Sequence, residues 1–410
     1  IDHIKASDSS VLANIGADLN GFTAAIEFDV SDTADNIASY VNQLTEADDV
    51  FVVSGDVSIS EAQSIQSLGG YNASGSTYEI EDSAANITAS TDTLMQNGTI
   101  KVDVTDSDVN ASIGADLAAF TADIEFDVSD TAANIAAQIA AGNGTNGTGY
   151  GADSLEDAGS VVVESGSAVL ASQAESIQDL VNYSGGDIDI TDSAANLISA
   201  GDHVLNVTGV DTVTVNAAGT GSTVTAQDGA ILAGFTADVE FDVVDDVSDL
   251  KAIMGQNDAA SYLTEANSIT VDNGSGDRVV GAQDGAILAS FTADVDFDVE
   301  ATASQLAAEV AAIGKTGNEL DEANSVVVLS GSSVSAEEAE AIIGITGYVG
   351  TQSDIDIIDD SADLISAGDP VLDATGVDYI RVESALAGGF GVNAADGAVL
   401  TSFSADIDFD

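Results

Sequence analysis

Short segments of this chain alternate apolar and acidic residues, and each segment is followed by a stretch with helical spacing. In residues 26–30 the apolar side chains alternate with Glu27 and Asp29. A period of two predicts a strand with a buried apolar face and an exposed acidic face. Directly afterwards, Ser31 or Asp32 can cap a helix by accepting an early helical N–H. The pattern therefore predicts a strand that leads directly into a helix.

The same order of strand and helix recurs along the chain. Strands are predicted at residues 50–54, 78–81, 99–104, 160–163, 187–190, 212–215, 325–328, 355–358 and 379–382. Helices are predicted at residues 58–68, 84–95, 167–180, 194–204, 337–345 and 364–372. One strand and its helix take about 25 to 28 residues, a length suited to one coil of a solenoid.

These steps predict the fold class. Right-handed crossovers would place the helices on one side of the strands. We therefore expect an α/β solenoid, in which repeated strand-helix coils form one long parallel sheet with helices packed on one side. A pair of conventional doubly wound domains is the alternative, but such a pair would not repeat one side-chain motif along its length.

A side-chain motif recurs five times without gaps and supports the repeat. Each copy has Gly six residues before a first Phe, Leu three residues before it and a second Phe six residues after it. The first Phe residues are Phe22, Phe120, Phe235, Phe291 and Phe403. We expect both rings of each copy to face inward. A second motif, Asp-(Ser/Thr)-Ala-x-Asn-(Ile/Leu), begins at Asp32, Asp82, Asp130 and Asp192, with a degenerate copy at Asp360.

The motif spacing divides the chain within one continuous solenoid. The predicted segments are a partial repeat (1–30), repeat unit 1 (31–128), repeat unit 2 (129–243), a half unit (244–299) and repeat unit 3 (300–410). Residues 1–6 match residues 377–382, so the chain is expected to begin and end inside a repeat. Either it is a window of a longer array, or its ends stack on neighbouring molecules.

The net charge of the chain limits the kinds of partner that it can bind. There are 71 Asp and Glu residues against six Lys and Arg residues, which gives a net charge of −65. Nucleic acid and anionic membrane surfaces are excluded as partners because both require clustered cations. The 45% apolar content nevertheless supplies enough side chains for a core, and the absence of cysteine excludes disulfides and thiolate sites. No membrane span or signal peptide is visible.

Outward acidic residues on neighbouring strands would repel one another, since parallel strands lie about 4.8 Å apart. External cations are therefore implied, and calcium fits because it prefers carboxylate and carbonyl oxygens. The candidate ligands lie in alternating acidic runs: Asp187, Asp189, Asp192, Asp294, Asp296, Asp298, Asp354, Asp356, Asp359, Asp406 and Asp408. The alternative is a solvated acidic face adapted to high salt, where screening weakens the repulsion.

The sequence argues against catalysis. Glu27 and Asp29 resemble a glycosidase carboxylate pair, but equivalents occur in every copy, whereas a catalytic site is built once. His3 and His203 have Tyr379 and Pro370 at the equivalent places of other copies, so neither is interpreted as a base or a ligand. Nine glycosylation sequons are present, at Asn72, Asn86, Asn97, Asn110, Asn143, Asn146, Asn182, Asn206 and Asn273.

The segments at residues 130–135 and 192–197, with the Val-Val-Val strands between the motifs, resemble the repeats of very large exported bacterial proteins. Calcium-dependent adhesins, surface-layer proteins and extracellular matrix proteins are among them. The resemblance covers nearly the whole chain. It implies export, a location at the cell surface and a scaffolding role.

We therefore predict a non-enzymatic structural protein of the cell exterior, which builds a filament, a surface lattice or an adhesin stalk stabilised by cations. Its expected partner is further copies of itself, with surface glycans left open. The alternative is a carbohydrate-binding or carbohydrate-cleaving solenoid, which would require an exposed aromatic row or one non-repeating polar cluster. A third interpretation, a ligand-binding adhesin tip, would place its site in an insertion at residues 142–157.

Overall fold

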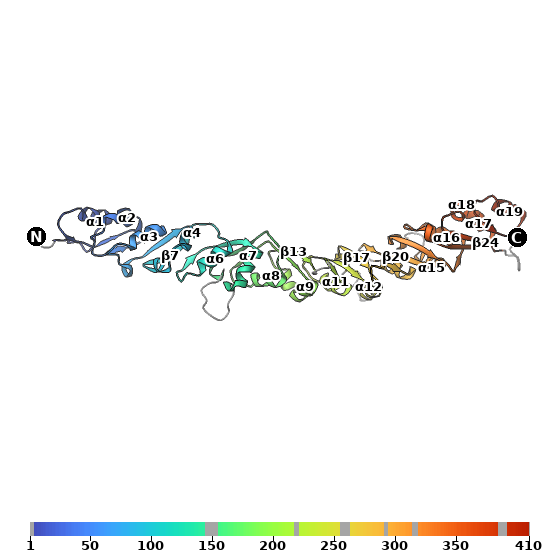
Figure 1. The fold of residues 1–410 in the computed structure, drawn as a ribbon, viewed down its shortest axis with the longest axis horizontal. Coiled ribbons are helices and arrows are strands. Elements are labelled where there is room, and N and C mark those ends of the chain that lie inside the picture. Colours follow the sequence, from blue (N-terminus) through green and yellow to red (C-terminus); the bar gives the residue numbers. More distant parts are fainter. Residues whose placement is uncertain are drawn as a thin grey trace. The chain divides into compact units, whose positions relative to one another are not determined.

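The computed structural model describes residues 4–143, 155–216, 221–254, 263–290, 294–313, 319–383 and 392–409. The protein is an α/β protein of short parallel strands with helices between them (Figure 1). It divides into two compact units, one formed by Ile1–Thr191 with Asp202–Thr212 and the other by Asp192–Gly201 with Val213–Asp410. The predicted alternation of strand and helix is thus confirmed.

The described part of the first unit contains eleven complete strands and nine α-helices. Its strands are β1 (Ile4–Lys5), β2 (Ile26–Glu27), β3 (Val30–Asp32), β4 (Val50–Val52), β5 (Asp56–Val57), β6 (Tyr78–Asp82), β7 (Thr99–Val104), β8 (Ile124–Glu125), β9 (Val128–Thr131), β10 (Val161–Glu164) and β11 (Tyr183–Gly186). Its helices are α1 (Ala13–Asn20), α2 (Ala34–Tyr40), α3 (Ile59–Gln66), α4 (Ala84–Thr88), α5 (Asp92–Gln96), α6 (Ala111–Ala118), α7 (Ala132–Gln138), α8 (Ala171–Gln178) and α10 (Asp202–Leu205). Strands β12 (Ile188–Asp192) and β13 (Val210–Val215) have residues in both units.

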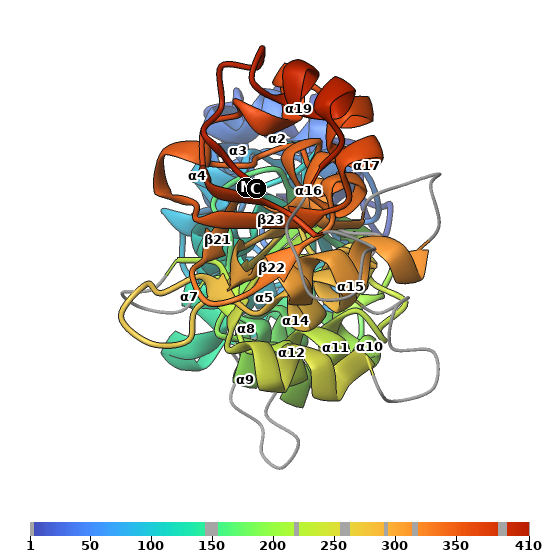
Figure 2. The same cartoon turned by 90° about the vertical axis from the view of Figure 1, so that its right-hand side faces the viewer.

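The second unit continues the same order of elements. Its strands are β14 (Thr223–Val224), β15 (Val239–Glu240), β16 (Asp242–Asp245), β17 (Ser268–Val271), β18 (Val279–Val280), β19 (Val295–Asp296), β20 (Asp298–Thr302), β21 (Ser325–Leu329), β22 (Ser333–Val334), β23 (Ile355–Asp359), β24 (Val377–Val382) and β25 (Ile407–Asp408). Its helices are α9 (Ala194–Ala200), α11 (Ala226–Leu232), α12 (Val247–Met254), α14 (Ala282–Leu288), α15 (Ala303–Ile313), α16 (Ala336–Ile343), α17 (Ser361–Ala367), α18 (Asp369–Leu372) and α19 (Ala394–Leu400). Figure 2 shows α15 and α16 beside β22 and β23, which they contact.

The strands pair in parallel with strands that lie nearby in the sequence. One four-stranded sheet of the first unit has the order β5-β6-β7-β8, and two of the second unit have the orders β14-β16-β17-β19 and β22-β23-β24-β25. The one long sheet that we expected is not what the described residues form, since their sheets contain two to four strands each. The strand predicted at residues 26–30 explains the difference, because it is interrupted between β2 and β3. Strand β2 pairs with β1, which precedes it, whereas β3 pairs with β4, which follows.

The two Phe residues of the repeated motif have different environments. The second Phe is buried in the copies at Phe28, Phe126, Phe241 and Phe297. The first is not, and the expectation that both rings face inward is wrong for Phe22, which is 62% exposed. Phe120, Phe235 and Phe403 are partly exposed, and Phe291 lies outside the described residues. The first Phe follows the end of a helix in a turn, where the helical spacing that would bury it no longer applies.

The repeated glycine of the motif lies where a helix approaches a strand most closely. A Cβ atom on Gly285 would lie 2.8 Å from Val299 Cγ2 and 3.3 Å from Phe297 Cε2. A Cβ atom on Gly16, Gly114 or Gly229 would lie similarly close to the equivalent Val and Phe side chains. Since packed interiors leave no room for an added methyl group at such distances, glycine at this position permits the buried Phe beneath the helix.

Three helices that the sequence predicts as single elements are each broken in two. Residues 84–95 form α4 and α5, residues 194–204 form α9 and α10, and residues 364–372 form α17 and α18. In the last of these, Gly368 has φ of +65° between the two helices. Glycine adopts this conformation without the steric cost that a Cβ atom imposes, so the chain changes direction there.

Replacing Gly285 with Ala is expected to destabilise the second unit by about 1–3 kcal/mol, the usual cost of overpacking a filled core. The measurement is urea unfolding of the full chain followed by circular dichroism. Gly69→Ala is the control, because no atom lies within 4 Å of a Cβ built there. Equal stability of the two variants would contradict the proposed role of the repeated glycine.

Candidate functional site

An aspartate at the end of a strand bonds to the first residue of a helix about twenty residues earlier in the chain. In the first copy, Asp32 Oδ2 accepts a hydrogen bond from the backbone N–H of Ala13, at 2.9 Å, and Ala13 is the first residue of α1. The other oxygen, Oδ1, accepts from the backbone N–H of Thr33 and from Asn36 Nδ2, both at 2.8 Å. This carboxylate therefore joins a strand end, the following helix and an earlier helix.

Equivalent carboxylates recur in the described residues, and we name them the strand-end aspartates: Asp32, Asp82, Asp130, Asp192, Asp245 and Asp359. Four further helix-start amides are bound in the same way, with Ile59 donating to Asp82, Ala111 to Asp130, Ala226 to Asp245 and Ala336 to Asp359. Asp192 Oδ1 accepts from Ser193 N–H and from Asn196 Nδ2, both at 2.7 Å. A helix start has unpaired N–H groups and the positive end of the helix dipole. A carboxylate accepts hydrogen bonds from those N–H groups, and its negative charge is attracted by the dipole.

The structure corrects the capping role that we expected for Ser31 or Asp32. The N-cap of α2 is Thr33, whose side chain accepts from Asn36 N–H. Asp32 precedes the cap and is 8% exposed. Burial alone would raise the pKa of Asp32, but the hydrogen bonds from Asn36, Ala13 and Thr33 outweigh it and the net shift of this pKa is downward. The pKa of Asp82 is lowered in the same way, by Asn86, Ile59 and Ser83 against burial.

Two copies replace the asparagine of this arrangement with an aspartate. In four copies the residue four positions after the strand-end aspartate is Asn36, Asn86, Asn134 or Asn196, and its amide donates to the carboxylate. After Asp245 the residue at this position is Asp249, and after Asp359 it is Asp363. A donor has thus been replaced by a second acceptor, so two carboxylates face each other where the other copies have a hydrogen bond.

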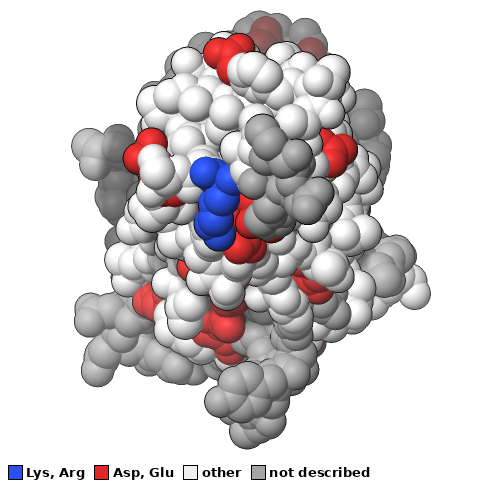
Figure 3. Space-filling view, turned by 90° about the vertical axis from the view of Figure 1, so that its left-hand side faces the viewer, with Lys and Arg blue, Asp and Glu red and all other residues white. Residues whose placement is uncertain are grey.

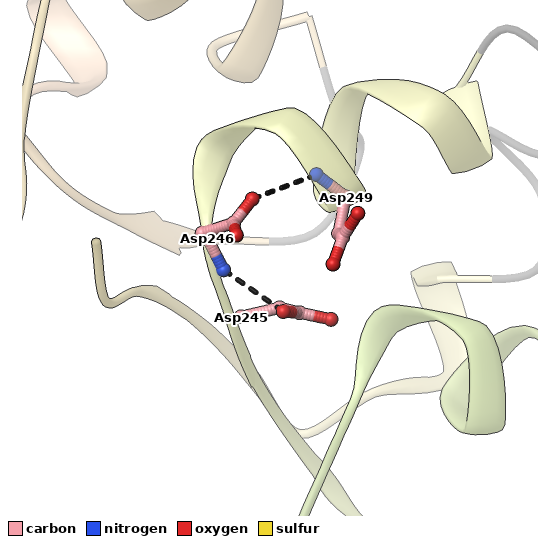
Figure 4. A group of neighbouring side chains, drawn as sticks. All are labelled: Asp245, Asp246 and Asp249. Carbon is pink, nitrogen blue, oxygen red and sulfur yellow. Dashed lines mark hydrogen bonds between the residues drawn. The ribbon is translucent and has the colours of Figure 1, made fainter. Parts of the chain in front are cut away.

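The replacement creates two acidic triplets, which we define as Asp245–Asp246–Asp249 and Asp359–Asp360–Asp363. In each, one oxygen of every carboxylate lies within 4.8 Å of the others. Figure 4 shows the first triplet, in which Asp246 N–H donates to Asp245 and Asp249 N–H donates to Asp246. No side chain among the three can donate a hydrogen bond while all are ionised. Oxygen ligands grouped in this way are those that a hard divalent cation takes.

The neighbouring negative charges change the pKa values inside the triplets. The pKa of Asp249 is raised by Asp246 first and by Asp245 next. The pKa of Asp363 is raised by Asp360 and Asp359, with a smaller contribution from Glu337. Asp246 behaves differently, because hydrogen bonds from Ser248 and Asp249 lower its pKa. In each triplet, the neighbouring charges therefore raise the pKa of the residue that replaces asparagine.

Of the metal ligands that the sequence predicted, Asp359 falls within an acidic triplet. The other ten, Asp187, Asp189, Asp192, Asp294, Asp296, Asp298, Asp354, Asp356, Asp406 and Asp408, belong to no group of three clustered carboxylates among the described residues. Several of them are bound by side chains instead. Asp296 pairs with Arg278, Asp298 accepts from Ser325 Oγ at 2.5 Å, and Asp408 accepts from Tyr379 Oη at 2.9 Å.

The first run of predicted ligands is also divided. Asp189 accepts a hydrogen bond from Thr212 Oγ1 at 2.5 Å, and Asp192 belongs to the second unit as a strand-end aspartate. In the third run, burial first and then Asp354 and Asp378 raise the pKa of Asp356. Residues on alternating strand positions thus repel one another without converging, because successive outward side chains on one strand are spread along it.

Sequence reasoning missed Asp245, Asp246, Asp249 and Asp363. The last copy of the motif was counted from Asp360 rather than from Asp359, one residue out of register, and the copy that begins at Asp245 was not recognised. The apolar residue five positions after the strand-end aspartate fixes the register, because Ile37, Leu250 and Leu364 are all fully buried. Counting back from these residues would have aligned Asp249 and Asp363 with the asparagines.

Several described basic residues pair with acidic residues on the same strand, on a neighbouring strand or on a neighbouring helix. Lys101 Nζ lies 2.9 Å from Asp103 and 2.7 Å from Glu125, and Lys5 Nζ lies 4.0 Å from Glu27. Lys251 Nζ lies 2.5 Å from Asp284. Figure 3 shows one face of the molecule, where acidic side chains occur in separate small groups and basic ones form a single patch. Most carboxylates must therefore be balanced by ions from solution.

One groove in the described residues, of about 560 Å³, lies over α3 to α5 and is lined by uncharged polar residues such as Ser60, Gln63 and Thr91 together with Asp82. Asp82 is already held by Ile59 and Asn86. His203 lies 3.8 Å from Glu175 on the surface, while His3 and residues 144–154 of the expected insertion lie outside the described residues.

Neither a protein-family model nor a curated protein matches this chain. Within the part of the chain that the structure describes, no helix combines the length and the apolar character that crossing a membrane requires. The repeated geometry of the strand-end aspartates and the two acidic triplets is therefore the basis on which function is argued.

The pKa shifts predict an unusual dependence of stability on pH. Groups with a raised folded-state pKa, such as Asp249 and Asp363, stabilise fully below the ordinary value of 3.8 and lose this contribution as pH rises through the folded-state pKa. Groups with a lowered pKa, Asp32 and Asp82, stabilise above 3.8 and lose it as pH falls through the folded-state pKa. The melting temperature at low ionic strength should therefore be highest near pH 3.8 and fall toward neutral pH.

Thermal unfolding followed by circular dichroism across this pH range provides the measurement. Added salt should flatten the decline toward neutral pH, because screening weakens repulsion between exposed carboxylates. The double variant Asp249→Asn with Asp363→Asn should flatten it as well. A melting temperature that peaks at neutral pH in low salt would refute the expectation.

Proposed function

We propose that this chain is a non-enzymatic structural protein of the cell exterior, whose strand-helix repeats stack as an α/β solenoid and build a filament, a surface lattice or an adhesin stalk. The observation that carries the proposal is the strand-end aspartate. At six places in the described residues a carboxylate binds the first amide of a helix 19 to 23 residues earlier in the chain. One contact that fastens each repeat to the one before it is what a stacked scaffold needs.

A second repeated contact supports the same stacking. Tyr71 Oη donates to the carbonyl oxygen of Asn97 at 2.5 Å, and Tyr348 Oη donates to that of Thr375 at 2.9 Å. Tyr71 therefore reaches the turn before β7, and Tyr348 reaches the turn before β24. Together with parallel pairing from strand to strand, these bonds link successive repeats where they occur, so stiffness would accumulate with the number of repeats.

We propose a non-enzymatic role because the same acidic pairs recur along the chain. Acidic pairs such as Glu27 and Asp29 recur from copy to copy, and the most deeply placed carboxylates are engaged by backbone amides. A general acid or base needs a free oxygen within reach of a substrate, and a carboxylate that accepts several hydrogen bonds offers a poor one. The same carboxylates suit a role in holding the fold together.

Calcium is the proposed counterion, and the acidic triplets are its proposed sites. Asp249 and Asp363 remove the amide donor that the other copies provide, so a cation would replace the missing positive end of that hydrogen bond. Surplus negative charge elsewhere would keep neighbouring molecules apart until divalent ions bridge them. The location outside the cell, where calcium is abundant and weak sites can be filled, belongs to the same proposal.

Calcium should raise the melting temperature of the wild-type chain at constant ionic strength. One filled site stabilises by about 2.7 kcal/mol when free calcium exceeds the dissociation constant a hundredfold. The double variant Asp249→Asn with Asp363→Asn should melt higher than wild type in chelator, because the amides end the repulsion, and should lose most of the calcium response. Differential scanning calorimetry measures both effects.

Two matched controls sharpen this experiment. Asn134→Asp recreates the facing carboxylates beside Asp130 and should lower the melting temperature in chelator. Sodium chloride at equal ionic strength separates screening from binding. An equal calcium response in wild type and double variant would show that the triplets are not the sites.

Electron microscopy of the purified chain tests the scaffold itself. We expect ordered fibres or sheets in calcium that disperse in chelator. Single particles under both conditions would contradict self-assembly. Single particles that also bind or cleave oligosaccharides would favour the carbohydrate-active alternative.

A further inference from the structure

Besides Asn206, six sequon asparagines lie in the described part of the chain, and they differ in the hydrogen bonds that their side chains make. Asn72 Nδ2 donates to Asp49, Asn86 Nδ2 to Asp82, and Asn97 Nδ2 to Gln66. Asn182 Nδ2 donates to the carbonyl oxygens of Leu155 and Ala158, both at 2.8 Å. A glycan bond is made through this same nitrogen, so modification at these four positions would disrupt an existing contact.

Asn273 is exposed, but both the oxygen and the nitrogen of its side-chain amide form hydrogen bonds. Its Oδ1 accepts from Val247 N–H at 3.2 Å and its Nδ2 donates to the carbonyl oxygen of Val279 at 2.8 Å. Asn110 is exposed too, but it is the N-cap of α6, where Oδ1 accepts from Ile113 N–H. The middle residue of its sequon, Ala111, is wholly buried, so a transferring enzyme could not surround that sequon without opening the helix start.

Asn206 differs from all of these. It follows α10 in a turn, it is exposed, and no side-chain hydrogen bond to it is found among the described residues. Thr208, which completes the sequon Asn206-Val207-Thr208, is exposed as well. Surface turns with accessible hydroxyl and amide groups are where such sequons are modified.

We propose that Asn206 carries an N-linked oligosaccharide, an inference that rests on the proposed location outside the cell. The new bond joins Asn206 Nδ2 to the anomeric carbon of the sugar. The bond broken joins that carbon to the diphosphate of an activated sugar donor, which leaves with the electron pair, and one amide proton is lost to a base of the transferring enzyme. Modification would leave α10 intact, because the helix is held by backbone hydrogen bonds. One of them is donated by Asn206 N–H to the carbonyl oxygen of Asp202.

The test is glycopeptide mapping by mass spectrometry of the full chain recovered from its own cells. We expect a sugar mass on the peptide that contains Asn206. The variants Asn206→Gln and Thr208→Ala should each abolish it, whereas Thr208→Ser should retain it. Asn273→Gln is the matched control and should leave the glycan pattern unchanged, although its residue is also exposed.

The outcomes separate this inference from the proposed function. Protein recovered at the cell exterior with unmodified Asn206 refutes the glycan and leaves the scaffold standing. Protein recovered only inside the cell, without sugar, refutes both. A sugar mass that persists in Asn206→Gln and disappears in Asn273→Gln would also overturn the assignment, because exposure rather than a free amide would then select the site.

Discussion

The fold depends on satisfying the first backbone amide of each helix with a carboxylate from a later strand end. Isolated helix starts leave N–H groups without partners, and burying such groups costs free energy. In this protein Asp32 and its equivalents accept these bonds while also binding the start of their own following helix. Each aspartate therefore couples two helices and a strand. Hydrogen bonds to a charged group contribute about 1.5–3 kcal/mol each, so the contact can hold neighbouring repeats in register.

This arrangement explains how so acidic a chain can have a well-packed core. The deepest carboxylates are stabilised by amide donors rather than by basic side chains, of which the sequence has only six. The downward pKa shifts of Asp32 and Asp82 express that stabilisation, because hydrogen bonds to the ionised form outweigh the cost of burial. Among the described residues, acidic side chains other than Asp32 and Asp192 are at least partly exposed, so solvent and salt moderate their repulsion.

The two acidic triplets are departures from this solution. Asp249 and Asp363 occupy positions where asparagine would complete the hydrogen bond, and the local cost appears as their raised pKa values. The same replacement occurs in two copies with the same geometry. This recurrence is consistent with a role for the extra charges. The copy at β20 follows a different route, since Ala301 replaces the strand-end aspartate and Gln305 bonds to Thr302 instead. In that copy both the aspartate and the asparagine are replaced.

The sequence by itself determined the alternation of strand and helix, the parallel class of the fold and the positions of its repeated motifs, because periods of two and 3.6 record which face is buried. Tertiary structure decided where strands change partners, as between β2 and β3, and which helices break, as at Gly368. It also decided the roles of the acidic residues. Alternation along one strand predicts that carboxylates point outward, but convergence of carboxylates depends on which backbone amides lie opposite them. The motif register can align Asp249 and Asp363 with the asparagines, but the helix turn in the folded chain is what brings their carboxylates to the strand-end aspartates. Asp294 and Asp406 belong to no such cluster among the described residues.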